Sequence, residues 1–381
     1  MDALAQRSLR ALLLRDKDGT SPPGGGKRST KVYPEAQAAC FANERRGLVG
    51  FGVAGSLALG LCASAQASPG AAIAQIAKQF DEHPLIMMGE LHRYGQLHAF
   101  LREMIRDPRF ICRVDDVVVE FGNSRLQELA DAYAFGGNVT EIQLQSVWRE
   151  TAVPLTWNSP VYRKFYETVR DINKQHLCPH PIRIVLGDPP LDWSKIKTAK
   201  DYEPFTDRDG HFADVVEREV LSRHHRAFLL AGLAHAVKRR PQGAQGDLDE
   251  PDAAQLIERK HPRLLFCIVP VPSAAAAKAM QMGPPPSFRV VRGSELEHAD
   301  FGMIWNLDKK WPPMRDVVDG VLYLGSDKTL LYPSPTIYLD PAYQQELRRR
   351  ASIIKDHSGQ DFMPVLDDLL KEAAKEARSH E

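Results

Sequence analysis

The stretch LIMMGELH, Leu85–His92, is a short apolar run that ends in a glycine, an acid and a histidine. A second stretch, Ala227–His235 (AFLLAGLAH), has the same form. Two further apolar runs end in an acid, namely Val117–Glu120 (VVVE) and Ile184–Asp188 (IVLGD). Buried strands of a parallel sheet read as such runs. Because ligands of open α/β sheets bind beyond the carboxyl ends of the strands, the four segments predict one site at one rim.

Helical patterns alternate with the apolar runs, which is typical of an α/β fold with a mostly parallel or mixed sheet flanked by helices. The C-terminal tail is expected to be helical, and the polar N-terminal extension is expected to be disordered. We expect strands at residues 85–89, 116–121, 182–186, 227–231, 264–269 and 320–324, and helices at 96–106, 125–133, 139–149, 160–175, 210–223 and 274–279.

Charge and cysteine content narrow the class of protein. The 381 residues carry 49 Lys and Arg against 49 Asp and Glu, so the formal net charge is zero and gives no reason to expect a nucleic-acid partner. The expected partner is a small-molecule or peptide substrate. Of the five cysteines, Cys112, Cys178 and Cys267 follow the expected mature start. Their wide spacing predicts no disulfide framework, and Cys112 and Cys267 are expected to be buried as small hydrophobic residues.

The first 67 residues are typical of a leader. Polar residues 1–44 precede Arg45-Arg46, an apolar core at about 48–62, and the small residues that end at Ala67. This pattern predicts a secretory signal cleaved after Ala67, with export to the periplasm or the medium, and the arginine pair resembles a twin-arginine signal. The alternative is an uncleaved anchor, which would be the expected membrane contact. The expected domains are the leader at 1–67, one α/β domain at 68–340, and a charged helical tail at 341–381.

Glu90 and His92 are the first candidate site residues. In an extended segment, residues two apart point the same way, so both side chains can converge on one ligand or one metal ion. Histidine is a common metal ligand and a natural general base near neutral pH. The alternative for His92 is a histidine that caps the following helix.

Glu120 and His235 occupy equivalent places after other strands. A buried carboxylate at Glu120 needs a partner, or its pKa rises, and either outcome suits a metal ligand or a protonated acid. The alternative is a structural ion pair of Glu120 with Arg125 or Arg149. For His235, the alternative is a histidine whose hydrogen bonds are satisfied at a helix start.

Asp188 and Arg208 are supporting candidates. Asp188 precedes a proline, so it is either a turn residue or a ligand. Arg208 can orient a carboxylate or stabilise an oxyanion, and Asp209 is expected to cap the following helix. His98, inside the helix at 96–106, is expected to be structural or to support the site. No phosphate-binding glycine loop and no G-x-S-x-G elbow occur in the sequence, which argues against an ordinary serine hydrolase.

The pattern Gly89-Glu90-Leu91-His92, then Glu120, then Gly232-Leu233-Ala234-His235 resembles the superfamily of erythromycin esterases, ChaN-type haem-binding lipoproteins and Tiki/TraB proteins. The resemblance covers about residues 80–330, and Tyr323-Leu324-Gly325 is similar to a closing strand of that group. It implies an α/β fold with a mixed sheet and a site where the two acids and two histidines converge. Erythromycin esterases activate water with a glutamate and histidines, Tiki proteins resemble metal-dependent peptidases, and the ChaN branch binds haem.

We therefore expect an exported hydrolase in which Glu90, His92, Glu120, His235 and Arg208 carry the catalysis. A divalent metal ion (Zn, Mn or Co) could assist, with the expected ligands Glu90, His92, Asp188 and His235. The first alternative is a haem- or metal-binding uptake protein without catalysis, in which Tyr94 would reach the haem iron. The second alternative is a scaffold whose rim binds a partner.

Overall fold

The computed structural model describes residues 69–241, 251–302, 310–326 and 329–379, all within one compact unit. The leader expected at residues 1–67, with its signal and cleavage point, lies outside the described residues. No helix in the described ranges combines the length and apolar character needed to cross a membrane.

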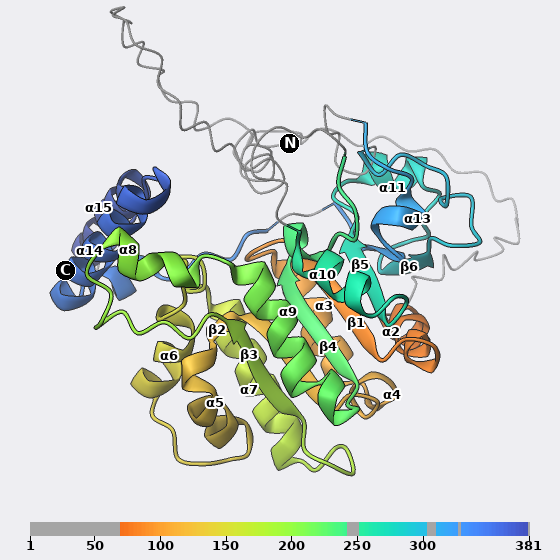
Figure 1. Cartoon of the computed structure of the whole chain (residues 1–381), viewed down its shortest axis with the longest axis horizontal. Helices are drawn as coiled ribbons and strands as arrows, with labels where there is room; N and C mark the ends of the chain where they lie inside the picture. Colours follow the sequence, from red (N-terminus) through yellow and green to blue (C-terminus); the bar gives the residue numbers. More distant parts are fainter. Residues whose placement is uncertain (1–68, 242–250, 303–309, 327–328, 380–381) are drawn as a thin grey trace, which may run out of the picture. The chain divides into compact units, whose positions relative to one another are not determined.

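A seven-stranded sheet forms the centre of the fold, with strand order β3-β2-β4-β1-β5-β7-β6 (Figure 1). All neighbouring strands are parallel except β6 and β7, which pair in antiparallel fashion. The strands are β1 (Leu85–Glu90), β2 (Asp116–Asn123), β3 (Arg183–Asp188), β4 (Ala227–Gly232), β5 (Leu265–Pro270), β6 (Ser287–Val290) and β7 (Gly320–Tyr323).

Helices connect the strands and cover the sheet. The described α-helices are α2 (Pro69–Lys78), α3 (Gly95–Arg106), α4 (Pro108–Ile111), α5 (Gln127–Ala134), α6 (Glu141–Arg149), α7 (Pro160–Lys174), α8 (Ala199–Tyr202), α9 (Arg208–Glu219), α10 (Ala253–Lys260), α11 (Ala274–Ala279), α13 (Met314–Val317), α14 (Pro341–Ser358) and α15 (Met363–Ser379).

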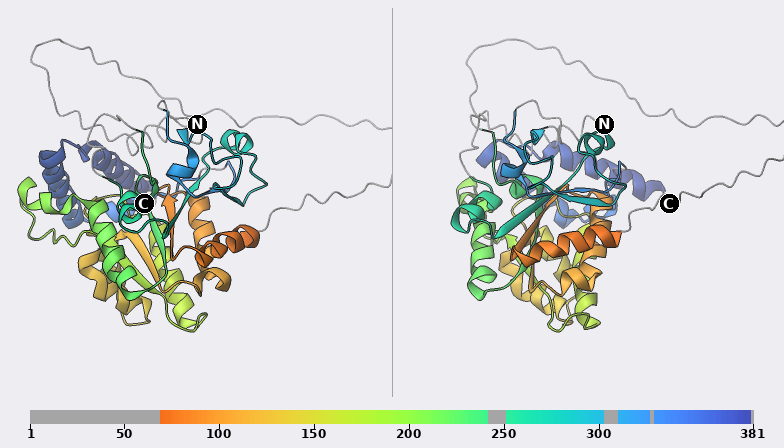
Figure 2. Two further views of the ribbon diagram at one scale, coloured as in Figure 1. Left: turned by 45° about the vertical axis from the view of Figure 1, so that its right-hand side comes forward. Right: turned by 90° about the vertical axis from the view of Figure 1, so that its right-hand side faces the viewer.

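Side chains that point alternately to the two faces of the sheet form a hydrophobic core on each face. In β1, Ile86 and Met88 join the core formed with helices α2 to α7, whereas Leu85 and Met87 join the core formed with α9 and α10. Successive strand residues point to opposite faces, so a continuous apolar run is the pattern of a strand buried on both sides. The two helix layers are visible on either side of the sheet in Figure 2.

The strand order places a switch point at the centre of the sheet. From β1 the chain moves outward to β2 and β3, and then returns to insert β4 between β2 and β1 before it continues to β5. Such a reversal of strand order leaves a crevice at the carboxyl ends of the strands, where ligands of open α/β sheets bind. The register pairs Glu90 with Gly232, so the ends of β1 and β4 lie level.

The predicted α/β class with a mostly parallel sheet is confirmed. Strand β6 was not predicted, because it is a four-residue edge strand directly after the proline-rich turn at 283–286. The C-terminal tail is helical and contains two helices, α14 and α15. Arg350 of α14 is buried and stacks on Trp193, with its Cζ atom 4.9 Å from a ring centroid. Helix α14 therefore packs against the segment that follows β3.

The prediction for Cys112 was wrong. Cys112 and Cys178 form a disulfide that joins the end of α4 to the loop after α7, across 66 residues of sequence. Wide spacing does not exclude a bridge, because the chain returns to the same end of the sheet before β3. Cys267 is buried as a free thiol in β5, as expected.

Candidate functional site

The ends of four adjacent strands bring the expected site residues to one rim. Glu90 ends β1, Asp188 ends β3, and Glu120 lies near the end of β2. His235 lies in a 3-10 helix, Leu233–Ala236, that directly follows β4. Because β3, β2, β4 and β1 are neighbours and run parallel, their carboxyl ends meet at the same edge.

Glu90 is a buried carboxylate held by two hydrogen bonds. Its Oε1 atom accepts from Nε2 of His98 at 2.7 Å and from the hydroxyl of Tyr162 at 2.8 Å. Burial disfavours the carboxylate, but the charges of His98 and His92 outweigh burial and lower the pKa of Glu90 to about 2. Its Oε2 atom has no hydrogen-bond partner among the described residues and faces Nδ1 of His92 at 3.4 Å. Glu90 therefore presents one free anionic oxygen to His92.

His92 lies between Glu90 and Glu120. Its ring meets the ring of Trp157 edge-on, with centroids 4.6 Å apart. A Cβ atom built on Gly232 would lie 3.3 Å from His92 Nε2 and 3.3 Å from Glu120 Oε2. The lack of a side chain at Gly232 therefore leaves one space that the imidazole and the second carboxylate share. The His92 side chain is 17% exposed, so water can reach it.

Glu120 is fixed by three donors. Its Oε1 atom accepts from Nη2 of Arg208 at 2.7 Å and lies 3.2 Å from Nε2 of His235. Its Oε2 atom accepts from the backbone amide at the end of β4 at 2.5 Å. Burial alone would favour a neutral acid, yet His235 and Arg208 hold the pKa of Glu120 well below its usual range. Its ion-pair partner is thus Arg208, rather than Arg125 or Arg149, and Glu120 is no protonated acid at neutral pH.

Asp188 and Arg208 brace Glu120 from the β3 side. Nε of Arg208 donates to Oδ1 of Asp188 at 2.8 Å, and the backbone amide of Ala152 donates to Oδ2 of Asp188 at 2.6 Å. Burial raises the pKa of Asp188, and the charge of Arg208 opposes that shift. Asp188 is therefore an orienting residue at a strand end and not only a turn residue. Arg208 orients a carboxylate, as the sequence suggested.

His235 is held as an imidazolium by two carboxylates. Its Nδ1 atom bonds Oδ1 of Asp209 at 2.6 Å, and its Nε2 atom faces Glu120. Burial disfavours this charge, but Asp209 and Glu120 raise the pKa of His235 to about 10. The prediction that Asp209 caps α9 was wrong: Asp207 accepts from the amide three residues on at 2.8 Å, and Asp209 accepts from the amide of Ala253 instead.

The expected metal ligands do not fit a metal ion. Both Asp188 oxygens accept protein hydrogen bonds, and both His235 nitrogens face carboxylates. Among the four expected ligands, this leaves Glu90 Oε2 and the ring of His92 as the groups that could still ligate a metal ion. Across the described ranges, no group of three or more His, Cys, Asp or Glu side chains is arranged to hold a metal.

Tyr94 does not support the expected haem contact. It is 3% exposed, belongs to the core that α3 forms, and its backbone makes an antiparallel bridge with Leu330. An axial ligand needs a side chain that reaches the iron from an open groove. The side chain of Tyr94 is instead buried in the core.

Three supporting residues carry little sequence signal. His98 was expected to be structural or to support the site, and it does hold Glu90. Tyr162 of α7 and Trp157 of the preceding loop were not predicted as site residues. Both side chains are buried in the core, and only the fold brings the Tyr162 hydroxyl against Glu90 and the Trp157 ring against His92.

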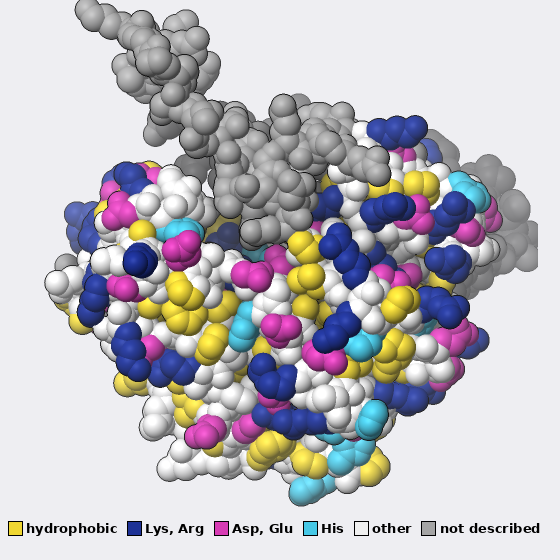
Figure 3. Space-filling model, in the orientation of Figure 1, with side chains coloured by type: hydrophobic (Ala, Val, Ile, Leu, Met, Phe, Trp, Pro, Cys, Tyr) yellow, Lys and Arg dark blue, Asp and Glu magenta, His cyan; other side chains and the backbone are white. Residues whose placement is uncertain are grey.

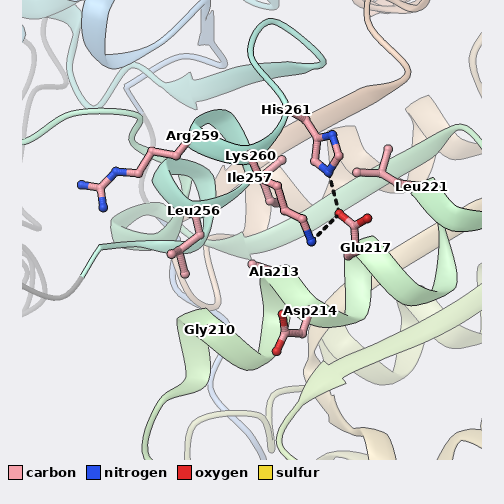
Figure 4. Close-up of a pocket in the computed structure, with 10 residues that line it drawn as sticks. All are labelled: Gly210, Ala213, Asp214, Glu217, Leu221, Leu256, Ile257, Arg259, Lys260 and His261. Carbon is pink, nitrogen blue, oxygen red and sulfur yellow. Dashed lines mark hydrogen bonds and ion pairs between the residues drawn. The ribbon is translucent and has the colours of Figure 1, made fainter.

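The described surface also has cavities away from this rim. One of about 390 Å³ lies between α9 and α10, where Glu217 bonds His261 and Lys260 (Figure 4). None of the expected site residues lines it. On the face shown in Figure 3, acidic and basic side chains are interspersed.

No family model matches the chain, and no curated protein matches its sequence. Two solved structures are similar to it. A protein from Bacillus cereus has 9% identity and a TM-score of 0.42, covering 66% of this chain and 97% of its own. A succinoglycan biosynthesis protein has 9% identity and a TM-score of 0.45, covering 69% of this chain and 97% of its own. Likeness at this level carries no argument about activity.

Proposed function

We propose that the protein is an exported hydrolase of esters or amides, with His92 as the general base, in the superfamily of erythromycin esterases, ChaN-type proteins and Tiki/TraB proteins. One observation carries the proposal: the ring of His92 lies between two carboxylates held in their ionised form, Glu90 and Glu120, at a partly open strand rim. Glu90 faces Nδ1 of His92, which leaves Nε2 as the ring nitrogen that can accept a proton on the side of Glu120.

In the proposed reaction, a water molecule lies over Gly232 between His92 Nε2 and Glu120 Oε2. His92 Nε2 accepts a proton as the water oxygen attacks the scissile carbonyl carbon. The imidazolium, stabilised by Glu90, then returns the proton to the departing alkoxide or amine, and a carboxylic acid is released. Arg208 and His235 keep Glu120 ionised, so that it orients the water and stabilises the imidazolium.

Export is part of the proposal. The leader pattern supports it, and so does the Cys112–Cys178 disulfide, because such bridges persist mainly in oxidising compartments. Fractionation of cells that produce the chain should place it outside the cytoplasm, with residues after Ala67 at the new N-terminus.

A hydrolysis screen with p-nitrophenyl esters and peptidyl anilides tests the activity. We expect His92→Ala to reduce turnover by about 10²- to 10⁴-fold, the range for loss of a general base. His298→Ala is the matched control, because His298 is exposed and remote in sequence from every strand end of the site. Equal turnover by wild type and His92→Ala would remove the enzyme proposal. Activity that a chelator abolishes would contradict the metal-free arrangement.

A further inference from the structure

A chain of four aromatic rings leads from one neighbour of Glu90 to another. The ring of His98 meets the ring of Tyr162 with centroids 5.3 Å apart, and Tyr162 meets Trp157 at 5.0 Å. The ring of Trp157 meets that of His92 at 4.6 Å, and all three contacts are edge-on. His98 and Tyr162 are fully buried, and they belong to α3 and α7, which pack together. Glu90 contacts both ends of this chain of rings.

The two oxygens of Glu90 have different surroundings. Oε1 accepts from Nε2 of His98 at 2.7 Å and from the hydroxyl of Tyr162 at 2.8 Å. Oε2 faces Nδ1 of His92 at 3.4 Å. The last torsion of a glutamate side chain is broad and roughly two-fold, so the carboxylate alone does not decide which oxygen faces which neighbour. Rotation away from this orientation gives up two hydrogen bonds to a charged group, which are among the stronger bonds in proteins. The two donors therefore fix Oε2 towards His92.

Tyr162 remains a donor across the neutral pH range. Burial and the neighbouring charge of Glu90 raise the pKa of Tyr162 well above its usual value, so the phenol keeps its proton. Its ring also packs against Trp157, which contacts His92. Tyr162 therefore touches the carboxylate through its hydroxyl, and through its ring it touches a neighbour of the imidazole. Because Tyr162 and His98 both lie on helices, they hold their partners more precisely than loop residues would.

We propose that Tyr162 and His98 are positioning residues of the proposed hydrolase. They act through Glu90 to direct Nε2 of His92 towards the space over Gly232. With Oε2 held against Nδ1, the proton of a neutral His92 ring resides on Nδ1, and Nε2 keeps the lone pair that accepts a proton from water. The 3.4 Å separation is long for a hydrogen bond, and such catalytic contacts often tighten only when substrate binds. The catalytic part of this assignment rests on the proposed function, whereas the orientation of His92 does not.

Tyr162→Phe tests the assignment, because it removes the hydroxyl and keeps the aromatic ring. Tyr166→Phe is the matched control: Tyr166 is equally buried one turn further along α7, and its hydroxyl bonds the backbone carbonyl of Phe121 at 3.0 Å. Urea unfolding of both variants identifies any general loss of stability. We expect Tyr162→Phe alone to lower kcat by about 10- to 100-fold with KM within about twofold, because a displaced base costs rate and leaves binding intact. Nitrogen-15 NMR should show His92 protonated on Nδ1 in wild type and Tyr166→Phe, and a mixture of tautomers in Tyr162→Phe.

His98→Gln and His98→Leu give a second test from the other helix. The side-chain amide of glutamine can donate from about the place of Nε2 of histidine, whereas leucine has no donor. His98→Gln should therefore retain most of kcat and the tautomer of His92, and His98→Leu should lose both.

The outcomes separate the positioning role from the hydrolase. The same kcat and the same His92 tautomer in Tyr162→Phe and Tyr166→Phe would overturn the positioning role, as would equal losses in His98→Gln and His98→Leu. A His92 tautomer that changes in Tyr162→Phe alone, in a protein without hydrolase activity, would support the orientation and remove the hydrolase. Hydrolysis that requires His92 but is equal in all four variants would keep the hydrolase and remove the positioning role.

Discussion

Gly232→Ala tests whether the space over Gly232 holds the reacting water. The new methyl carbon would lie 3.0 Å from His92 Cε1 and 3.3 Å from both His92 Nε2 and Glu120 Oε2. Ordinary contacts between such atoms are about 3.5–4.0 Å, so the imidazole must retreat by about 0.5 Å or more. The methyl group would also occupy the place that we assign to the water.

The expected loss is kinetic more than structural. A displacement of about 1 Å at a reacting centre can cost about 10²-fold in rate, so we expect kcat to fall by about 10- to 100-fold, or about 1.4–2.7 kcal/mol. Gly232 has φ −51° and ψ 148°, which alanine adopts without strain. Overpacking costs about 1–3 kcal/mol, and the lower entropy of the unfolded chain returns about 0.4–1 kcal/mol. Folding stability should therefore fall by no more than about 2.5 kcal/mol.

The assay compares kcat and KM on the best ester from the screen with urea unfolding of the same samples. Gly283→Ala is the matched control, because its added Cβ would meet nothing closer than 3.7 Å. Ring resonances of His92 should shift in Gly232→Ala and not in Gly283→Ala. Full activity of a folded Gly232→Ala variant would refute the placement of the water, as would an equal loss in both variants.

Three further predictions concern stability. The pKa of Glu90 is about 2, against an ordinary value of 4.5. Its ionisation therefore contributes about 3 kcal/mol to the free energy of unfolding above pH 4.5, and this contribution is lost as the pH falls towards 2. Acid unfolding should therefore be steeper in wild type than in Glu90→Gln. The pKa of His235 is about 10, against an ordinary value of 6.5. The stabilisation of the fold by its positive charge is therefore complete below pH 6.5 and is lost as the pH rises through 10. Asp209→Asn removes its closest partner, so urea unfolding at pH 7 and 10 should differ less in that variant. Reduction of the Cys112–Cys178 bridge, which closes 66 residues, should lower the unfolding free energy by up to about 4 kcal/mol, and an unchanged urea midpoint with dithiothreitol would contradict the bridge.

The sequence predicts the strand ends well because each buried strand is a local pattern. The runs before Glu90, Glu120, Asp188 and His235 are apolar on both faces, which is the pattern of parallel strands covered by helices on both sides. The sequence could not predict which cation would meet Glu120. Arg208 is 88 residues away, whereas Arg125 lies nearby in sequence, and only the strand order decides between them.

The sequence also could not predict which aspartate caps α9. Asp207 and Asp209 both precede or open α9, and either can serve as a cap. The structure assigns the cap to Asp207, which leaves Asp209 to hold His235. A shift of two residues along the chain thus separates a structural role from a role in the site.

The charges of the rim alternate in a continuous row: Asp188, Arg208, Glu120, His235 and Asp209. Each side chain in the row is at most 15% exposed. Burying five charges is a poor route to stability, because desolvation offsets most of the attraction and apolar residues of similar volume often do as well. Such a row fixes the position and charge of its central member, however, before any ligand arrives. That member is Glu120, the carboxylate that shares its space with His92, so the row is best understood as the support of one preorganised anion opposite the proposed base.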